Sequence, residues 1–199
     1  AIELEKYTYS DTDREKIRLK YGLGNAITVG HVGRNTFAKN HDFLVRVFSE
    51  VVKRIPNAKL MLVGIGEEAT NIVDMCKEYG IIDHVVFCGY QINPVPFYSA
   101  MDVMVFPSHY EGLPGTLIEA QATGLKCFAS DRITREVGIT PDIEFLSLDA
   151  HPKIWAERVV ENRKYTRNNN KEIIEKAGFS VKESARLMMN IYERGKTGI

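Results

Sequence analysis

Two glutamates flank a glycine-rich turn near the middle of the chain, and this stretch carries its densest set of ligand-binding groups. Glu111 lies in the turn, and Glu119 lies in the following segment, which is predicted to be helical. The segment between them, residues 112–116, would leave backbone N–H groups uncovered where that helix begins. Such N–H groups suit phosphate oxygens, and neighbouring carboxylates suit the hydroxyls of a sugar. The combination therefore indicates a site for a sugar nucleotide.

Two cations follow the first predicted strand, in the pattern Gly33-Arg34-x-x-x-x-Lys39. The Arg34 guanidinium offers a planar fork for phosphate oxygens, and the Lys39 ammonium adds a mobile point charge. Each of these signals has a simpler explanation when it is taken alone. The cations can be solvated loop charges, and Glu119 can be an acidic residue that stabilises the start of a helix. Glu111, inside the turn, has no such explanation.

A glycine pattern follows the second predicted strand, where residues 64–69 formally match the G-x-G-x-x-A pattern of dinucleotide-binding proteins. That pattern requires an acidic residue about 20 positions further on, where this chain has Phe87-Cys88-Gly89 instead. Two adjacent glutamates in the segment would also repel a pyrophosphate. An NAD-linked oxidoreductase is therefore the least favoured hypothesis. Gly64 and Gly66 are better explained by a closely packed turn that serves another ligand.

The remaining polar and sulfur groups exclude several other kinds of site. The backbone of residues 88–91 could hydrogen-bond a planar base, with Tyr90 as a wall, although a plain turn is the alternative. The three cysteines lack a C-x-x-C spacing and are predicted to be free, buried thiols. No His, Cys or Asp residues have the spacing of metal ligands, and Ser108 is not part of a nucleophile elbow. His31 is predicted to be buried rather than catalytic.

Alternating strands and helices would bring these groups together. A regular strand–helix alternation predicts a doubly wound α/β fold with a parallel sheet of about six strands and helices on both faces. In such a sheet, ligands bind at the carboxyl ends of the strands, where all of the groups above lie. The predicted strands are residues 26–32, 59–63, 85–88, 103–106, 126–129 and 143–148. The most periodic helix begins at Asn40 or His41 and runs to Ile55, and three helical segments end the chain, at about 153–162, 170–177 and 181–193.

Composition indicates an ordinary globular protein of 199 residues, which suffices for one sizeable domain or two small ones. The chain has 26 basic and 26 acidic residues, so its net charge gives no indication of nucleic acid or an acidic membrane surface. No apolar run approaches the length of about 20 residues that spans a bilayer, and the first residues do not resemble a signal peptide. Because the chain starts with Ala1, we expect a fragment of a longer protein.

Taken in order, the turns resemble the C-terminal, donor-binding domain of a retaining glycosyltransferase of the GT-B fold, from the family called glycosyl transferase group 1. The resemblance covers nearly the whole chain. The paired glutamates in their turn-and-helix context are its most specific part. The matching segments are Val32-Gly33-Arg34 with Lys39-Asn40-His41, residues 60–66, residues 86–90, residues 100–103, and residues 107–120.

The resemblance implies roles for individual residues. Arg34 and Lys39 would neutralise the diphosphate of the sugar donor as the glycosidic bond breaks, and Glu111 would hold the transferred sugar as the third catalytic residue. Glu119 would accept hydrogen bonds from the ribose hydroxyls. No permanent cofactor and no metal are implied. Further contacts to the UDP- or GDP-sugar would come from Gly33, Gly64, Gly66, Cys88, Gly89, Tyr90, Gly112, Leu113, Gly115 and Thr116.

The resemblance also implies a domain arrangement. Residues 1–24 would be a linker with a short helix, residues 25–199 would bind the sugar donor, and the N-terminal domain that binds a glycan or lipid-linked acceptor would be absent from this chain. We expect the chain to bind a nucleotide diphosphate weakly and to transfer no sugar alone. The implied setting is bacterial capsular or exopolysaccharide synthesis, in the cytoplasm or at the inner face of the cell membrane by peripheral association, without nucleic acid. The alternative is a nucleotide-sugar-binding regulatory module without transferase activity.

Overall fold

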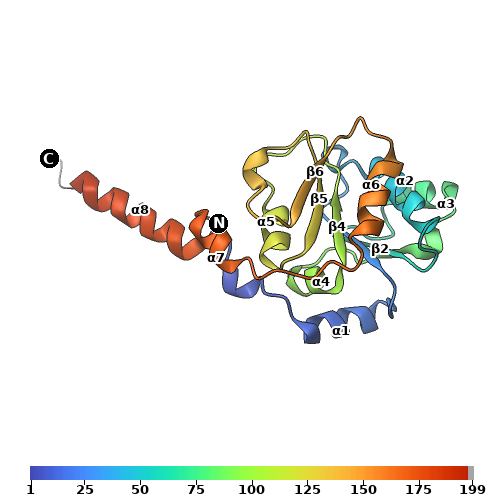
Figure 1. Cartoon of the computed structure of the whole chain (residues 1–199), viewed down its shortest axis with the longest axis horizontal. Coiled ribbons are helices and arrows are strands. Elements are labelled where there is room, and N and C mark those ends of the chain that lie inside the picture. Colours follow the sequence, from blue (N-terminus) through green and yellow to red (C-terminus); the bar gives the residue numbers. More distant parts are fainter. Residues whose placement is uncertain (197–199) are drawn as a thin grey trace.

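Six short strands form one parallel sheet in the computed structural model, which describes residues 1–196 (Figure 1). Their order across the sheet is β3-β2-β1-β4-β5-β6, so the predicted doubly wound, six-stranded fold is confirmed. The central strand β4 is buried at every position, because helices cover both faces of the sheet. The strands are β1 (Thr28–Val32), β2 (Lys59–Val63), β3 (Val85–Phe87), β4 (Val103–Phe106), β5 (Lys126–Ser130) and β6 (Ile143–Leu146).

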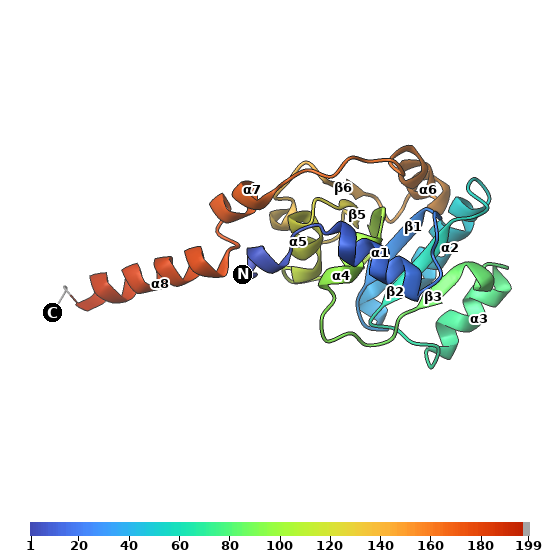
Figure 2. The same ribbon diagram turned by 90° about the horizontal axis from the view of Figure 1, so that it is seen from below.

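The helices divide between the two faces of the sheet and form two hydrophobic cores. One core joins the sheet to α2 (His41–Val52), α3 (Thr70–Glu78) and α6 (Pro152–Glu161). The other joins it to α1 (Asp11–Lys20), α4 (Val95–Ala100), α5 (Gly115–Ala122) and α7 (Lys171–Lys176). The last helix, α8 (Val181–Lys196), runs away from the sheet (Figures 1 and 2). Short 3-10 turns lie at Leu4–Lys6, Phe37–Lys39, Ile82–His84 and Arg135–Val137.

The boundaries of two predicted elements differ from the sequence-based expectation for physical reasons. The first strand begins at Thr28 rather than Ala26, because the Ala26 N–H donates to the Leu23 carbonyl at 3.0 Å and closes a turn. The sequence pattern predicts an extended lead-in segment over residues 1–9, and in the structure a 3-10 turn at Leu4–Lys6 interrupts it. Helix α2 starts at the predicted place, where the Asn40 side chain caps it by accepting from the Phe43 N–H.

No helix within residues 1–196 has both the length and the apolar character needed to cross a membrane. The three cysteines are free and buried, as predicted. Burial raises the pKa of the Cys76 thiol to about 11 and that of the Cys88 thiol to about 12, so neither is a thiolate at neutral pH.

Candidate functional site

The candidate site lies where the strand order reverses, between the carboxyl ends of β1 and β4. Strands β1 to β3 extend to one side of this point, and strands β4 to β6 extend to the other. The chain leaves β1 at Gly33 and leaves β4 at Pro107, so the two following loops diverge from neighbouring strands. A crevice at such a reversal is the usual ligand-binding position in an open α/β sheet.

The structure brings Lys39 and Glu111 into direct contact across this crevice, although they are 72 residues apart. The Lys39 Nζ atom lies 2.8 Å from Glu111 Oε1, and each side chain is only 16% exposed. The same ammonium lies 4.4 Å from the centre of the Phe106 ring. Because the pair is shielded from water, its attraction is stronger than that of a surface ion pair.

Hydrogen bonds to backbone carbonyls hold the loops after β1 and β4 together beside this ion pair. The His109 N–H donates to the Ala38 carbonyl at 2.8 Å, and the Asn40 side-chain amide donates to the Pro107 carbonyl at 3.1 Å. Asn40 has a left-handed backbone, with φ of 55°, in which it also caps α2. One residue thus fixes the start of the helix and the position of Lys39 beside it.

Gly33 makes room for the lysine chain. A Cβ atom at this position would lie 3.1 Å from Lys39 Cε and 3.3 Å from His31 Nε2, which is tighter than ordinary packing allows. Arg34, the next residue, is exposed and forms no ion pair with any residue that the structure describes. The two predicted phosphate-binding cations therefore differ, because one is anchored by a carboxylate and the other is open to solvent.

Two histidines lie behind Lys39 and are held neutral by burial. The rings of His31 and His41 meet edge to face at 4.9 Å, and His31 Nδ1 lies 3.0 Å from the Val105 carbonyl, to which it donates. Burial, aided by the His41 charge, lowers the pKa of His31 well below its usual value. Burial and the nearby Lys39 charge lower the pKa of His41 to about 4. The prediction that His31 is a buried residue is confirmed.

The glycine-rich turn before α5 exposes its backbone, as predicted. Gly115 is the first residue of α5, and within the described chain no side chain caps this helix. Gly112 and Gly115 are exposed, and no atom lies within 4 Å of the position of an added Cβ. The first N–H groups of α5 are therefore open to an anion, which the helix dipole also favours. Leu113 is 47% exposed beside them, and Thr116 is half-buried.

Glu119 lies in the second turn of α5 and is held by two tyrosines that the sequence analysis missed. The Tyr7 hydroxyl donates to Glu119 Oε1 at 3.1 Å, and the Tyr98 hydroxyl donates to Glu119 Oε2 at 2.6 Å. Tyr7 belongs to the lead-in segment, 112 residues from Glu119. No periodic pattern in the sequence indicates that this segment passes over α5.

A groove of about 650 Å³ opens beside Glu119. The lead-in segment, including Tyr7, forms one wall, and residues 92–95 after β3 form another. A second hollow of about 710 Å³ lies between α2 and α3 and includes neither glutamate. Its arginines are already paired, Arg46 with Asp42 and Arg132 with Asp149. Of these two hollows, only the groove is lined by one of the two glutamates, so it is the better candidate for the proposed ligand.

The glycines after β2 and β3 serve mainly to pack neighbouring turns. Gly64 has a φ of +92°, and a Cβ atom there would lie 2.7 Å from the Gly33 carbonyl oxygen. Its N–H donates to the Gly89 carbonyl at 2.9 Å, and the Gly89 N–H donates to the Ile65 carbonyl at 2.8 Å. Gly66 is restricted locally by the Glu68 side chain. The exposed part of this edge is Tyr90, which is 80% accessible.

Residues 1–196 contain no cluster of three or more His, Cys, Asp or Glu side chains suited to hold a metal ion. The segments that follow β1 and β4 instead supply two cations, two carboxylates and an uncapped helix N-terminus. This set fits a ligand with both anionic oxygens and neutral hydroxyls.

A family described as glycosyl transferases group 1 matches residues 13–141, well over half of the chain. The chain belongs to this family. EpsF of Bacillus subtilis (strain 168) is 29% identical over 197 residues, covering 96% of this chain and 51% of EpsF. The capsular polysaccharide biosynthesis glycosyltransferase CapM of Staphylococcus aureus is 33% identical over 126 residues, covering 61% of this chain and 32% of CapM. The chain spans about half the length, or less, of these relatives.

Solved structures agree with this family membership at the level of fold. Sucrose-phosphate synthase from Thermosynechococcus elongatus has a TM-score of 0.81 at 24% identity, covering 100% of this chain and 52% of that one. HepE of Anabaena in complex with UDP has a TM-score of 0.80 at 17% identity, covering 97% and 56%. The six-stranded sheet with helices on both faces matches one half of a GT-B glycosyltransferase, so the predicted resemblance is confirmed.

Proposed function

We propose that this group 1 domain is the C-terminal, donor-binding half of a retaining glycosyltransferase. The whole enzyme would move a sugar from a UDP- or GDP-linked donor to a glycan or lipid-linked acceptor held by a second half. The observation that carries the proposal is the meeting of Lys39, Glu111 and the open start of α5 at the strand-order reversal. The UDP bound to HepE, a structural neighbour, supports a UDP-linked donor.

The cations and the helix would bind the diphosphate. The Lys39 ammonium has three hydrogen-bond donors and gives one to Glu111, so it can still bind phosphate oxygens. Arg34 is exposed at the same strand end and adds a guanidinium. The N–H groups of Gly115 and Thr116 lie at the positive end of α5. As the glycosidic bond breaks, negative charge grows on the leaving diphosphate, and these groups would stabilise it without a metal.

The two carboxylates would bind hydroxyl groups. Glu111 would hold the transferred sugar close to the diphosphate, where Lys39 offsets its charge. Glu119 would accept from the ribose. It lies four residues beyond Gly115, about 6 Å along the helix axis, a spacing similar to that between the phosphate and ribose hydroxyls of a nucleotide. The Gly89 N–H and the Gln91 side-chain amide are used within the protein, so contact with the base would fall mainly to Tyr90 and the backbone of Gln91.

CapM supports a setting in capsular or exopolysaccharide synthesis, since this relative is a capsular polysaccharide biosynthesis glycosyltransferase. The acceptor would bind to the second half of the enzyme. In this proposal the present chain recognises the sugar donor and stabilises the leaving group, and it transfers no sugar alone.

Binding and transfer assays test this proposal. We expect UDP or GDP to bind this chain in a calorimetric titration, and we expect Arg34→Ala and Lys39→Ala to weaken binding. Arg186→Ala is the matched control, because Arg186 is an exposed arginine of α8 whose ion pair is with Glu183. When the chain is joined to an acceptor-binding half, a UDP- or GDP-sugar should be consumed. Nucleotide binding without transfer in the joined protein would favour a regulatory module instead.

A further inference from the structure

Hydrogen bonds from two tyrosine hydroxyls occupy one acceptor position on each oxygen of the Glu119 carboxylate. Tyr7 donates to one oxygen and Tyr98 donates to the other. An ionised carboxylate has about four acceptor positions, so each oxygen keeps one free. Two free acceptor positions on adjacent oxygens match the two neighbouring hydroxyls of a ribose. The tyrosines therefore determine which direction of the carboxylate remains available.

Both tyrosines act as hydrogen-bond donors at neutral pH. Tyr98 is fully buried, and burial next to Glu119 raises its pKa well above the usual value. Burial and the Glu119 charge raise the pKa of Tyr7 to about 12. Because both phenols keep their protons, the carboxylate must accept from them, and its orientation is the same throughout the neutral range.

The two tyrosines are anchored differently. Tyr98 is held by the core beneath α4, whereas Tyr7 is half-buried and lies on the lead-in segment. Their rings are 6.4 Å apart and tilted by 57°, so Tyr7 also packs against Tyr98. Tyr98 is thus a fixed partner, and Tyr7 is present at Glu119 only while the lead-in is docked.

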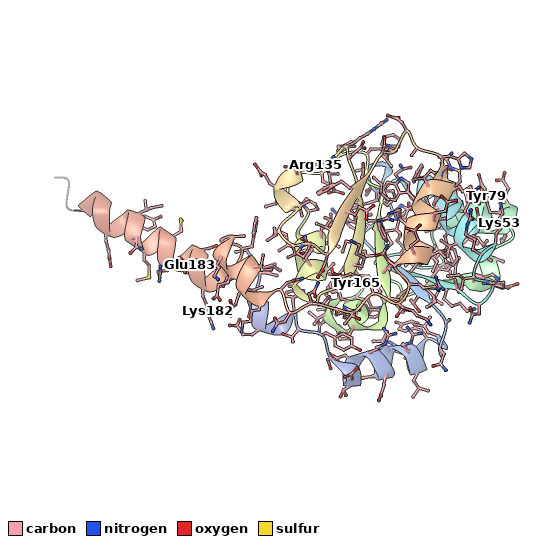
Figure 3. All side chains as sticks on the ribbon, viewed as in Figure 1. Lys53, Tyr79, Arg135, Tyr165, Lys182 and Glu183 are labelled. Atoms are coloured by element: carbon pink, nitrogen blue, oxygen red, sulfur yellow. The ribbon has the colours of Figure 1, made fainter. Side chains whose placement is uncertain are left out.

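Contacts of the residues that precede Tyr7 dock the lead-in. The Ile2 N–H donates to the Phe179 carbonyl at 2.7 Å, and the Val181 N–H donates to the Ile2 carbonyl at 3.0 Å. Lys182, in the first turn of α8 (Figure 3), pairs with Glu5 at 2.6 Å. The position of Tyr7 therefore depends on the two segments that begin and end the described chain.

We propose that Tyr7 is a positioning residue for nucleotide recognition and that, with Tyr98, it orients the Glu119 carboxylate toward the ribose diol. This inference rests on the proposed role of Glu119 in binding the sugar donor. It adds that ribose recognition depends on the docked lead-in, because one of the two hydroxyls that orient Glu119 comes from it.

A chemical double-mutant cycle tests the inference. UDP and 2′,3′-dideoxy-UDP are titrated against the unaltered chain and against Tyr7→Phe, which keeps the ring and removes only the hydroxyl. We expect Tyr7→Phe to lower the affinity for UDP about three- to tenfold, because a misoriented carboxylate loses part of a charged hydrogen bond. The same substitution should leave the affinity for dideoxy-UDP unchanged, since that ligand has no diol from which Glu119 could accept hydrogen bonds.

Tyr9→Phe is the matched control. Tyr9 lies on the same segment, but its hydroxyl donates to Asp11 at 2.7 Å rather than to Glu119. We expect Tyr9→Phe to leave the affinity for both ligands unchanged. An equal loss for UDP and dideoxy-UDP in Tyr7→Phe, or no loss for either, overturns the positioning role. Absence of binding of both UDP and GDP to the unaltered chain would instead contradict the proposed function itself.

Discussion

Glu111 and Glu119 lie in one turn and its helix, yet the protein surrounds them with opposite partners. Glu111 accepts from the ammonium of Lys39, which offsets its charge, whereas Glu119 accepts from two phenols and forms no ion pair among the described residues. A carboxylate beside a diphosphate would repel it unless a cation offset the charge. A carboxylate that binds neutral hydroxyls has no such need. The different partners therefore favour the proposed placement of phosphate and sugar on the Glu111 side, and of the ribose on the Glu119 side.

Removing the Lys39 ammonium should cause the largest loss of nucleotide affinity. In Lys39→Ala, the diphosphate loses a charged hydrogen-bond donor and meets an unpaired Glu111. We expect nucleotide affinity to fall by about 3 kcal/mol in calorimetry. In Lys39→Ala/Glu111→Ala the repulsion is also removed, so about half of the loss should be recovered. A double variant no better than the single variant would contradict the claim that Lys39 offsets Glu111.

Removing the other carboxylate should cost less. In Glu119→Ala the ribose loses its hydrogen-bond acceptor, but no unpaired charge is created near the phosphates. We expect UDP affinity to fall by about 2 kcal/mol and dideoxy-UDP affinity to stay constant. Calorimetric titration measures both. Unchanged UDP affinity would rule out Glu119 as the ribose acceptor.

The two sides also differ in their response to acid, because among the described residues buried histidines lie behind the Glu111 side, whereas Glu119 is held by phenols that keep their protons. The pKa of His41 is about 4 in the folded protein, below its usual value near 6.5, so the unfolded chain binds more protons between these values. Stability is therefore fully present above about pH 6.5 and is lost as the pH falls toward 4. We expect His41 to contribute a loss of about 1.5 kcal/mol in the free energy of unfolding between pH 6.5 and 5, as measured by denaturant unfolding.

His41→Gln should reduce that pH dependence. Part of it will remain, because burial also lowers the pKa of His31. A variant with the same pH dependence as the unaltered protein would show that His41 does not titrate as described.

The exposed cation should have the smallest effect. Arg34 is open to solvent and forms no ion pair with any described residue, so Arg34→Ala should leave the free energy of unfolding unchanged. We expect nucleotide affinity to fall by about 1 kcal/mol, with a loss that shrinks as salt is added. Titrations at low and high salt check this. A loss as large as that of Lys39→Ala would mean that the two cations share the phosphates equally.

Much of the fold follows from local sequence pattern, and the reasons are visible in particular residues. The apolar run of β4 and the helical spacing of α2 report burial directly, and Asn40 marks the start of α2. The site residues could be grouped from the sequence, because the carboxyl ends of parallel strands lie at one edge of a sheet. The strand order in the structure then explains why the loops after β1 and β4 meet. The sequence could not reveal that Lys39 and Glu111 form an ion pair, since each side chain had several possible partners.

The tyrosines at Glu119 lay beyond sequence reasoning altogether. Tyr7 comes from an irregular segment whose path is set by contacts with Phe179 and Val181 near the other end of the chain. No period of 2 or 3.6 residues encodes such a path. Tyr98 lies in a short helix whose buried face is read easily, but its hydroxyl partner on α5 is 21 residues away.

A structure of this chain with UDP bound tests the central claim most directly. We expect the diphosphate to lie against Arg34, Lys39 and the first N–H groups of α5, with the ribose hydroxyls on the free acceptor positions of Glu119. UDP found in the hollow between α2 and α3, or with its ribose away from Glu119, would contradict it.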